Sequence, residues 1–103
     1  MVGRMAIYRY SGDAQDLGRR AEAGILPILQ AAQGFASYTV AEGDGEIVSL
    51  SAWQTRGDAE AASEAVADWV AGNMTEIEVV SVRYVNVLFS TTLGVSTLAS
   101  STA

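Results

Sequence analysis

The side chains best suited to bind or transform a ligand are aromatic or hydroxylic, and they fall on stretches with strand-like alternation. Tyr8 and Tyr10 share one face of such a stretch, Ser49 and Trp53 share one face of another, and Tyr38 lies in a third. Phenol, hydroxyl and indole groups donate hydrogen bonds, so they could orient the oxygens of a small aromatic ligand. Core packing is the competing interpretation of each residue, because the same side chains also fill ordinary protein interiors.

Two further candidates lie in the second half of the chain. Trp69 falls on the apolar stripe of a predicted helix, where core packing and the lining of a ligand pocket both remain open. Arg83 lies in an apolar stretch and could bind an enolate or carboxylate, or form an intersubunit salt bridge with an acid. Glu60, Glu64 and Asp68 recur every four residues, which indicates a solvated helix face.

The composition excludes chemistry that depends on imidazole or thiol groups. The 103 residues include no His and no Cys, so the chain offers no disulfide, no thiolate metal site and no His-ligated haem. The acidic residues show no spacing typical of a metal-liganding loop, and the sequence has no glycine-rich phosphate-binding loop. We therefore expect no metal, flavin or other cofactor.

The charge balance limits the partners of this chain. Its formal net charge is -6, and all six basic residues are Arg. Such an acidic chain lacks the basic surface that nucleic acid or an anionic membrane would require. The longest apolar stretch, residues 79–89, is interrupted by Arg83 and Asn86 and is too short to span a membrane. The N-terminus has no signal-peptide pattern, so we expect a cytoplasmic protein.

The elements that must position these side chains are predicted in the order βαββαβ. Alternating apolar residues predict strands at 5–10, 35–42, 47–53 and 76–89. Apolar residues spaced by three and four predict one helix from a cap at Asp13 or Ser11 to about Ala32, and another that opens at Thr55 and ends at Gly72-Asn73. Pro27 predicts a kink or a restart in the first helix.

This order indicates a ferredoxin-like α+β fold, with a four-stranded antiparallel sheet and both helices on one face. We expect a single domain over residues 1–89. The uncovered face would be apolar, so we predict a homodimer through the sheet that includes Val79, Val85 and Val87. Residues 90–103 are uncharged and Ser/Thr-rich, and are expected to form a flexible tail or an arm across the partner.

Three short motifs resemble the antibiotic-biosynthesis-monooxygenase-like family of the dimeric α+β barrel superfamily over about residues 4–89. They are Gln33-Gly34-Phe35 before the second strand, Ser51-Ala52-Trp53-Gln54-Thr55 after the third, and Ala67-Asp68-Trp69-Val70 in the second helix. The resemblance implies two sheets packed face to face in a dimer, with a separate pocket between sheet and helices in each monomer.

The resemblance implies different activities for different branches. Some members oxidise aromatic polyketides or quinols with dioxygen and no cofactor, others bind and open haem, and many have no known reaction. An Asn and an aromatic residue of the polyketide type fall on Ser49 and Ala59 here. An Asn and a Trp of the haem-degrading type fall on Tyr8 and Trp69, but the iron-ligating His has no counterpart. We therefore expect no haem degradation by that route.

Two classes of function follow from these residues. The first is a cofactor-independent monooxygenase acting on a small phenol or quinol, with Tyr8, Ser49, Trp53 and Trp69 forming the polar rim of its pocket. The alternative is a non-enzymatic small-ligand-binding or accessory dimer on the same scaffold. The size of the pocket discriminates between a ligand site and a purely structural core, because an open cavity of several hundred Å³ suits a ligand.

Overall fold

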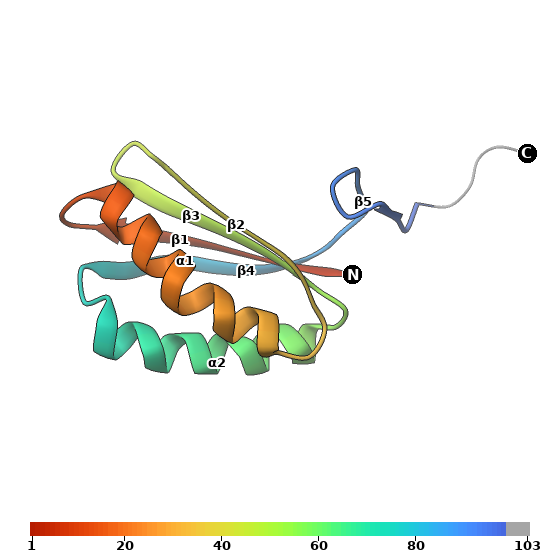
Figure 1. Cartoon of the computed structure of the whole chain (residues 1–103). Helices are drawn as coiled ribbons and strands as arrows, with labels where there is room; N and C mark the ends of the chain where they lie inside the picture. The colour runs from red at the N-terminus through yellow and green to blue at the C-terminus, as the bar shows by residue number, and fades with distance from the viewer. Residues whose placement is uncertain (99–103) are drawn as a thin grey trace, which may run out of the picture.

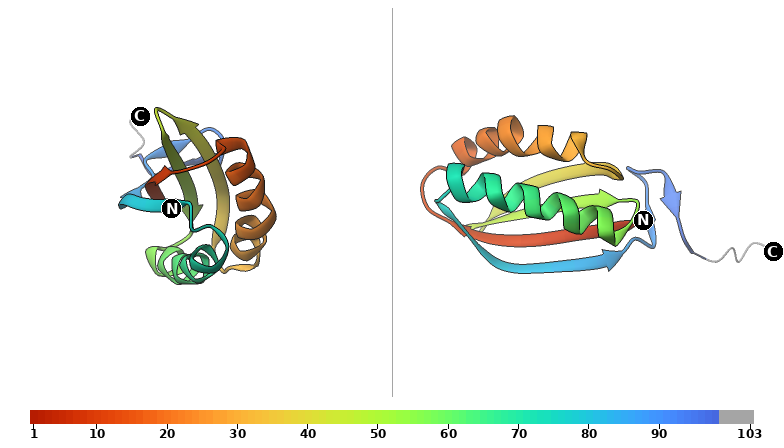
Figure 2. Two further views of the ribbon diagram at one scale, coloured as in Figure 1. Left: turned by 90° about the vertical axis from the view of Figure 1, so that its left-hand side faces the viewer. Right: turned by 90° about the horizontal axis from the view of Figure 1, so that it is seen from below.

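The computed structural model describes residues 1–98 as a four-stranded antiparallel sheet with two helices packed on one of its faces (Figure 1; Figure 2). The elements are β1 (Val2–Tyr10), α1 (Ala14–Ala31), β2 (Phe35–Gly43), β3 (Glu46–Trp53), α2 (Arg56–Asn73), β4 (Ile77–Asn86), β5 (Phe89–Ser90) and β6 (Val95–Ser96). The strand order in the sheet is β2-β3-β1-β4. The predicted ferredoxin-like α+β fold is therefore confirmed.

Strand β1 is central, since it pairs with β3 on one side and with β4 on the other. Residues that face one another across antiparallel strands lie on the same face of the sheet. Arg4 is opposite Ser51, Ala6 is opposite Ser49, and their side of the sheet faces the helices. The intervening residue Met5 lies on the uncovered face. The alternation predicted for β1 and β3 thus holds in the structure.

The fourth strand is shorter than predicted. Its last partner on β1 is Val2, which lies opposite Asn86, and the next backbone amide, that of Val87, donates to the carbonyl oxygen of Met1 at 3.1 Å. β4 therefore ends level with the start of β1, at Asn86, and does not continue to residue 89.

The chain beyond β4 forms a small hairpin of β5 and β6, which projects from the end of the sheet (Figure 1). Leu88, Phe89 and Leu98 expose most of their apolar side chains there. The rest of the expected tail or arm, residues 99–103, lies outside the described residues.

Both helices begin at the predicted caps. The carboxylate of Asp13 accepts from the backbone N–H groups of Gln15 and Asp16, and the hydroxyl of Thr55 accepts from the backbone N–H of Asp58 at 3.1 Å. The restart predicted at Pro27 does not occur, because α1 runs unbroken past this exposed residue. Within residues 1–98, no helix is both long and apolar enough to cross a membrane.

The hydrophobic core lies between the helices and the sheet. Trp53 is only 1% exposed, and its ring meets that of Phe35 edge to face at a centroid distance of 5.5 Å. The stripe of α1 that faces the sheet consists of Leu17, Ala21, Ile25 and Leu29, while α2 contributes the small residues Ala59 and Ala62. The fully buried side chains of α1 are therefore mostly larger than those of α2.

The two helices also contact each other directly. The ring of Trp69 in α2 lies against the backbone of Gly24 in α1, where a Cβ atom would overlap three ring carbons. Glycine is required at this point because no side chain fits between the helix backbone and the indole. Trp69 is therefore a helix-packing residue.

We predict that Gly24→Ala destabilises the fold by about 1–3 kcal/mol, because the methyl group must displace the indole of Trp69 or separate the helices. The matched control is Gly18→Ala in the same helix, where nothing lies within 4 Å of the added Cβ. That substitution should stabilise the protein by up to about 1 kcal/mol through helix propensity. Urea-induced unfolding of the two variants measures both effects, and similar changes in both would contradict the packing of Trp69 on Gly24.

Candidate functional site

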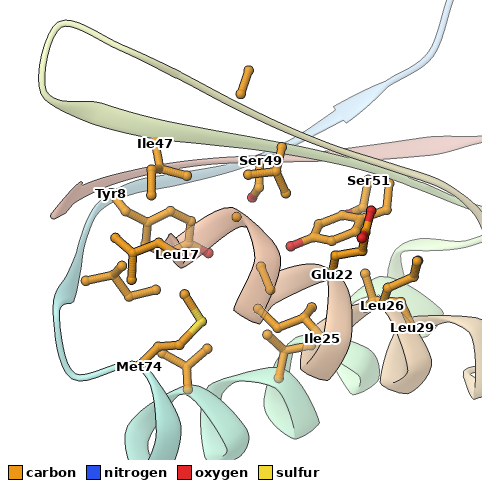
Figure 3. A pocket seen from close by; sticks show the side chains of 18 of the residues that line it. Tyr8, Leu17, Glu22, Ile25, Leu26, Leu29, Ile47, Ser49, Ser51 and Met74 are labelled. Carbon is orange, nitrogen blue, oxygen red and sulfur yellow. The ribbon is translucent and has the colours of Figure 1, made fainter. Parts of the chain in front are cut away.

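A cavity of about 480 Å³ lies between α1 and the sheet and is open to the surface (Figure 3). Strands β1, β2 and β3 form one wall, α1 forms the opposite wall, and residues from α2 and the start of β4 close one end. Its volume falls in the range of about 300–1,000 Å³ that is typical of small-molecule sites. The cavity is large enough for a ligand with fused aromatic rings.

The sheet wall of the cavity is polar. Arg4, Ser51 and Tyr38 form a row across β1, β3 and β2, because Ser51 is opposite both of the others in the register. Tyr8 and Ser49 line the same wall from β1 and β3. Side chains that alternate along a strand share a face, so these five residues all point toward α1.

The helix wall of the cavity is apolar. Figure 3 shows Leu17 and Ile25 of α1 across the cavity from Ser49 and Ser51. Leu29 continues this wall along α1, and Met74, which is 3% exposed, lines the end of the cavity. A flat ring held between these walls would meet aliphatic carbon on one side and hydrogen-bond donors on the other.

The hydroxyl of Tyr38 remains protonated at neutral and moderately alkaline pH. The pKa of this phenol is raised to about 12, mainly by burial and also by the nearby Tyr8, while the positive charge of Arg4 acts in the opposite direction. Tyr38 is therefore a neutral hydrogen-bond donor in the cavity.

The indole of Trp53 is satisfied within the protein. Its N–H donates to the hydroxyl oxygen of Ser51 at 2.9 Å, so its partner is neither a ligand nor a backbone carbonyl. A serine hydroxyl that accepts one hydrogen bond still carries its own hydrogen. Trp53 thus orients Ser51, whose O–H is available to donate into the cavity.

An ion-pair cluster fixes the closed end of the cavity. The guanidinium of Arg20 in α1 pairs with Glu76, donates to the carbonyl oxygen of Asn73 at 2.9 Å, and lies 3.2 Å from Asp16. The hydrogen bond from Arg20 lowers the pKa of Glu76. Because Glu76 precedes β4 directly, this cluster holds α1 against the connection between α2 and β4.

The structure brings together four of the six residues predicted as pocket candidates. Tyr8, Tyr38, Ser49 and Trp53 line the cavity, and none of them is adjacent to another in the sequence. Trp69 lies outside the cavity lining, against Gly24. Arg83 is exposed on β4 opposite Met5, on the face of the sheet that the helices leave uncovered.

Three residues of the site were missed in the sequence. Arg4 lies four residues before Tyr8 on a strand and Ser51 lies between Ser49 and Trp53 in the alternation, so their shared face was available as a signal. Glu22 lies off the buried stripe of α1, so no pattern in the sequence indicated a place at the cavity. In the structure it is exposed but its carboxylate lies at the cavity (Figure 3).

Metal binding finds no support in the arrangement of the described residues. Within residues 1–98, no three of the His, Cys, Asp and Glu side chains come together in a way that could hold a metal ion. Two kinds of oxygen atom line the cavity. They are the hydroxyl oxygens of the sheet wall and the carboxylate oxygens of Glu22 and Glu42.

Solved structures share this fold. SnoaB from Streptomyces nogalater, a cofactor-independent oxygenase, aligns with a TM-score of 0.70 and 10% identity over 87% of this chain and 95% of its own. A Chloroflexus aurantiacus protein named as an antibiotic biosynthesis monooxygenase aligns with a TM-score of 0.65 and 19% identity over 90% and 98% of the two chains. MhuD, in a structure with two manganese protoporphyrin IX molecules per active site, aligns with a TM-score of 0.66 and 14% identity over 87% and 97%.

The predicted resemblance to antibiotic-biosynthesis-monooxygenase-like proteins is thus confirmed in the fold. No family model matches the sequence, and no curated protein matches it. At these identities the comparisons establish the architecture shared with such proteins.

We predict that Tyr38 makes the stability of the protein depend on pH between about 10 and 12. In that window the folded chain keeps the Tyr38 proton that the unfolded chain has lost, so the free energy of unfolding falls as the pH rises. The loss should reach about 2 kcal/mol near pH 12. Below about pH 10 the folded and the unfolded chain both keep the proton, so Tyr38 causes no loss of stability there. Urea unfolding at several pH values should show a shallower dependence for Tyr38→Phe than for the unchanged protein. Equal slopes would contradict the burial of this phenol.

Proposed function

We propose that this chain is a cofactor-independent monooxygenase that oxidises a small aromatic phenol or quinol in the cavity between α1 and the sheet. The observation that carries the proposal is the composition of this cavity, which pairs a wall of hydroxyl donors with a wall of aliphatic carbon in a volume of about 480 Å³. The shared fold with SnoaB supports the same class of reaction. The chain is similar to that oxygenase in architecture, and the substrate assignment rests on the cavity.

The chemistry requires little from the protein beyond an anion site and a dry pocket. An anthrone, for example, loses a proton to give an enolate, which passes an electron to dioxygen. The resulting radicals combine to a carbon peroxide, which takes up a proton. Breaking the O–O bond with loss of the second carbon-bound proton gives the quinone carbonyl and releases water. Tyr8, Tyr38 and Ser49 would donate hydrogen bonds to the ring oxygens, and the α1 wall would exclude water.

A carboxylate at the cavity rim would accept the first proton. Glu22 and Glu42 are the two carboxylates among the described residues that line the cavity. Glu42 already accepts a hydrogen bond from the hydroxyl of Tyr10, at 3.3 Å. We therefore assign the proton acceptor to Glu22, which projects from α1 toward the sheet wall (Figure 3).

Porphyrin chemistry is not part of this proposal. MhuD shows that a chain of this architecture can hold a metalloporphyrin. This chain has no His anywhere in its 103 residues, so the iron ligand implied for the haem-degrading branch is missing.

The second function to test is ligand binding without catalysis. It is favoured by two positions where the polyketide-type resemblance implies an Asn and an aromatic residue. Ser49 stands at the first position, and Ala59, a fully buried core residue of α2, at the second. A protein of this kind would use the same cavity to bind an aromatic compound and would also act as a dimer.

We expect the purified protein to accelerate dioxygen uptake in the presence of a hydroquinone or an anthrone, with saturation kinetics and no effect of chelators. An oxygen electrode measures the rate, and the absorption spectrum and elemental analysis of the same sample report bound flavin or metal. Tyr8→Phe removes one hydroxyl from the cavity and should lower kcat/KM by about 10-fold or more, the scale of one hydrogen bond to a developing charge. Tyr84→Phe, which removes a phenol outside the cavity lining, is the matched control.

If dioxygen uptake is no faster than uncatalysed autoxidation while the same compounds still bind, the oxygenase hypothesis is wrong and the ligand-binding hypothesis is favoured. Loss of activity in both Tyr variants would instead indicate a general effect on the fold.

We also propose that the chain dimerises through the uncovered face of its sheet. Met5 and Leu50 face each other there across β1 and β3, and they expose 38% and 46% of their surface in the single chain. On β4, Val79 and Val82 lie opposite Tyr8 and Ala6 on the side of the helices, so of the residues predicted there it is Val85, opposite Gly3, that lies on the uncovered face. Such an apolar sheet surface is typical of an interface. The projecting hairpin after β4, with exposed Leu88, would add to it as an arm.

We predict a dimer at micromolar concentration that buries more than about 1,500 Å² in total. A charge placed at its centre, as in Leu50→Glu, should give monomers, because the interface would bury a carboxylate among apolar side chains. Ala67→Glu adds the same charge on the exposed surface of α2 and should leave the dimer intact. Multi-angle light scattering decides the matter, and a monomeric unchanged protein would refute the interface.

A further inference from the structure

Arg4 lies on a central strand of the sheet. It lies on β1, whose backbone is paired on both sides, and it stands between Ser51 on β3 and Tyr84 on β4. Its side chain is half-buried and lines the cavity on the wall that faces α1. The positive charge of Arg4 can therefore interact with a ligand in the cavity.

Arg4 has no internal counter-ion in the described part of the chain. The four ion pairs found within residues 1–98 use Arg19, Arg20 and Arg56 as their cations. The Nε atom of Arg4 is shielded from solvent and donates to no acceptor among these residues. A guanidinium removed from water normally pairs with an anion or with several acceptors, because leaving it without them is costly.

The neighbours of Arg4 on this wall are neutral donors. Tyr38 and Ser51 continue its row across the sheet, and Tyr8 and Ser49 lie beside them. The charge of Arg4 reaches Tyr38, whose pKa it lowers against the larger opposing effect of burial. A cation surrounded by hydroxyl groups is complementary to an anionic oxygen, which accepts several hydrogen bonds at once.

The charges at the rim do not account for this arrangement. Arg19, Glu22 and Glu42 also line the cavity, and all three are exposed. With two carboxylates and one guanidinium, the rim has a negative net charge, so it does not attract an anion. The preference for an anion is therefore a property of the interior wall around Arg4.

We propose that Arg4 is the anion-binding and specificity-determining residue of this cavity, and that the ligand is an aromatic compound with an anionic oxygen at the ring edge that meets the sheet. A carboxylate, a phenolate and an enolate share this chemistry. The proposal rests on the ligand-binding part of the proposed function and is independent of the reaction with dioxygen.

Matched probes separate the charge of the ligand from its shape. By isothermal titration calorimetry, 2-naphthoate should bind at least about 10-fold more tightly than 2-naphthamide, which has nearly the same shape without the charge. Arg4→Gln should weaken 2-naphthoate by roughly 10- to 100-fold and change 2-naphthamide by less than about threefold. Arg56→Gln removes the same charge from the exposed start of α2, outside the cavity lining, and should change neither.

A second probe distinguishes a phenolate from a carboxylate site. Bound 2-naphthol should show the naphtholate absorption band at a lower pH than free 2-naphthol, and this displacement should disappear in Arg4→Gln. Arg4→Lys should keep part of it, because the charge remains while the planar fork of donors is lost. Binding of 2-naphthoate without any displacement of the naphthol band would assign the site to carboxylates. A displaced band with weak 2-naphthoate binding would assign it to phenolates and enolates.

The outcomes also separate this proposal from the proposed function. Equal affinity for 2-naphthoate and 2-naphthamide, or an equal loss of both in Arg4→Gln, would overturn the role of Arg4 while leaving the cavity as a ligand site. Absence of binding by any naphthyl probe to the unchanged protein would overturn both. Thermal melts of Arg4→Gln guard against misfolding, and its melting temperature should stay the same or rise, since a shielded cation without a partner is removed.

Discussion

Two contacts hold α1 in place beside the cavity. At one point the indole of Trp69 fills the space over Gly24 and sets the distance between the two helices. At another, Arg20 ties α1 to Glu76 and to the carbonyl oxygen of Asn73. A helix that could move freely would collapse onto any empty volume, since packed interiors resemble crystals in density. These two contacts keep the wall of the pocket in place.

The sheet wall then accepts residues that a closed core would exclude. Ser49 and Ser51 are 7% and 8% exposed, and Arg4 lies among them with a shielded Nε. Only Ser51 has a side-chain partner here, the indole N–H of Trp53. Buried polar groups with spare hydrogen-bonding capacity reduce stability, so such a cluster is expected at a binding site and not in a structural core.

The sequence predicted this site where short-range alternation decides which way a side chain points. Tyr8, Ser49 and Trp53 line the cavity together because strand residues two apart share a face. The same rule covers Arg4, which was missed because the first strand was predicted to begin at residue 5, whereas β1 begins at Val2. The sequence is less informative where the surroundings of a side chain depend on how another helix or strand packs against it. Trp69 lies on the buried stripe of α2, but only the packing of α1 shows that its ring lies against Gly24 and outside the cavity lining.

The end of β4 illustrates the same limit. The Val-rich stretch continues to residue 89 in the sequence, yet the strand stops at Asn86, opposite Val2, the first residue of β1. The βαββαβ order, by contrast, depends on local patterns and on the caps at Asp13 and Thr55, which is why it was predicted from the residues alone.

Pocket and proposed interface alternate residue by residue along the same strands. Arg4 faces the cavity and Met5 the bare face, and on β3 Ser49 and Ser51 face the cavity while Leu50 between them does not. A slip of one residue in the pairing would exchange the two sets and place polar groups on the apolar face. Pairing of β1 on both sides opposes such a slip. A substitution on either face therefore tests one role of the sheet, because the side chains of the two faces are separated by the thickness of the backbone.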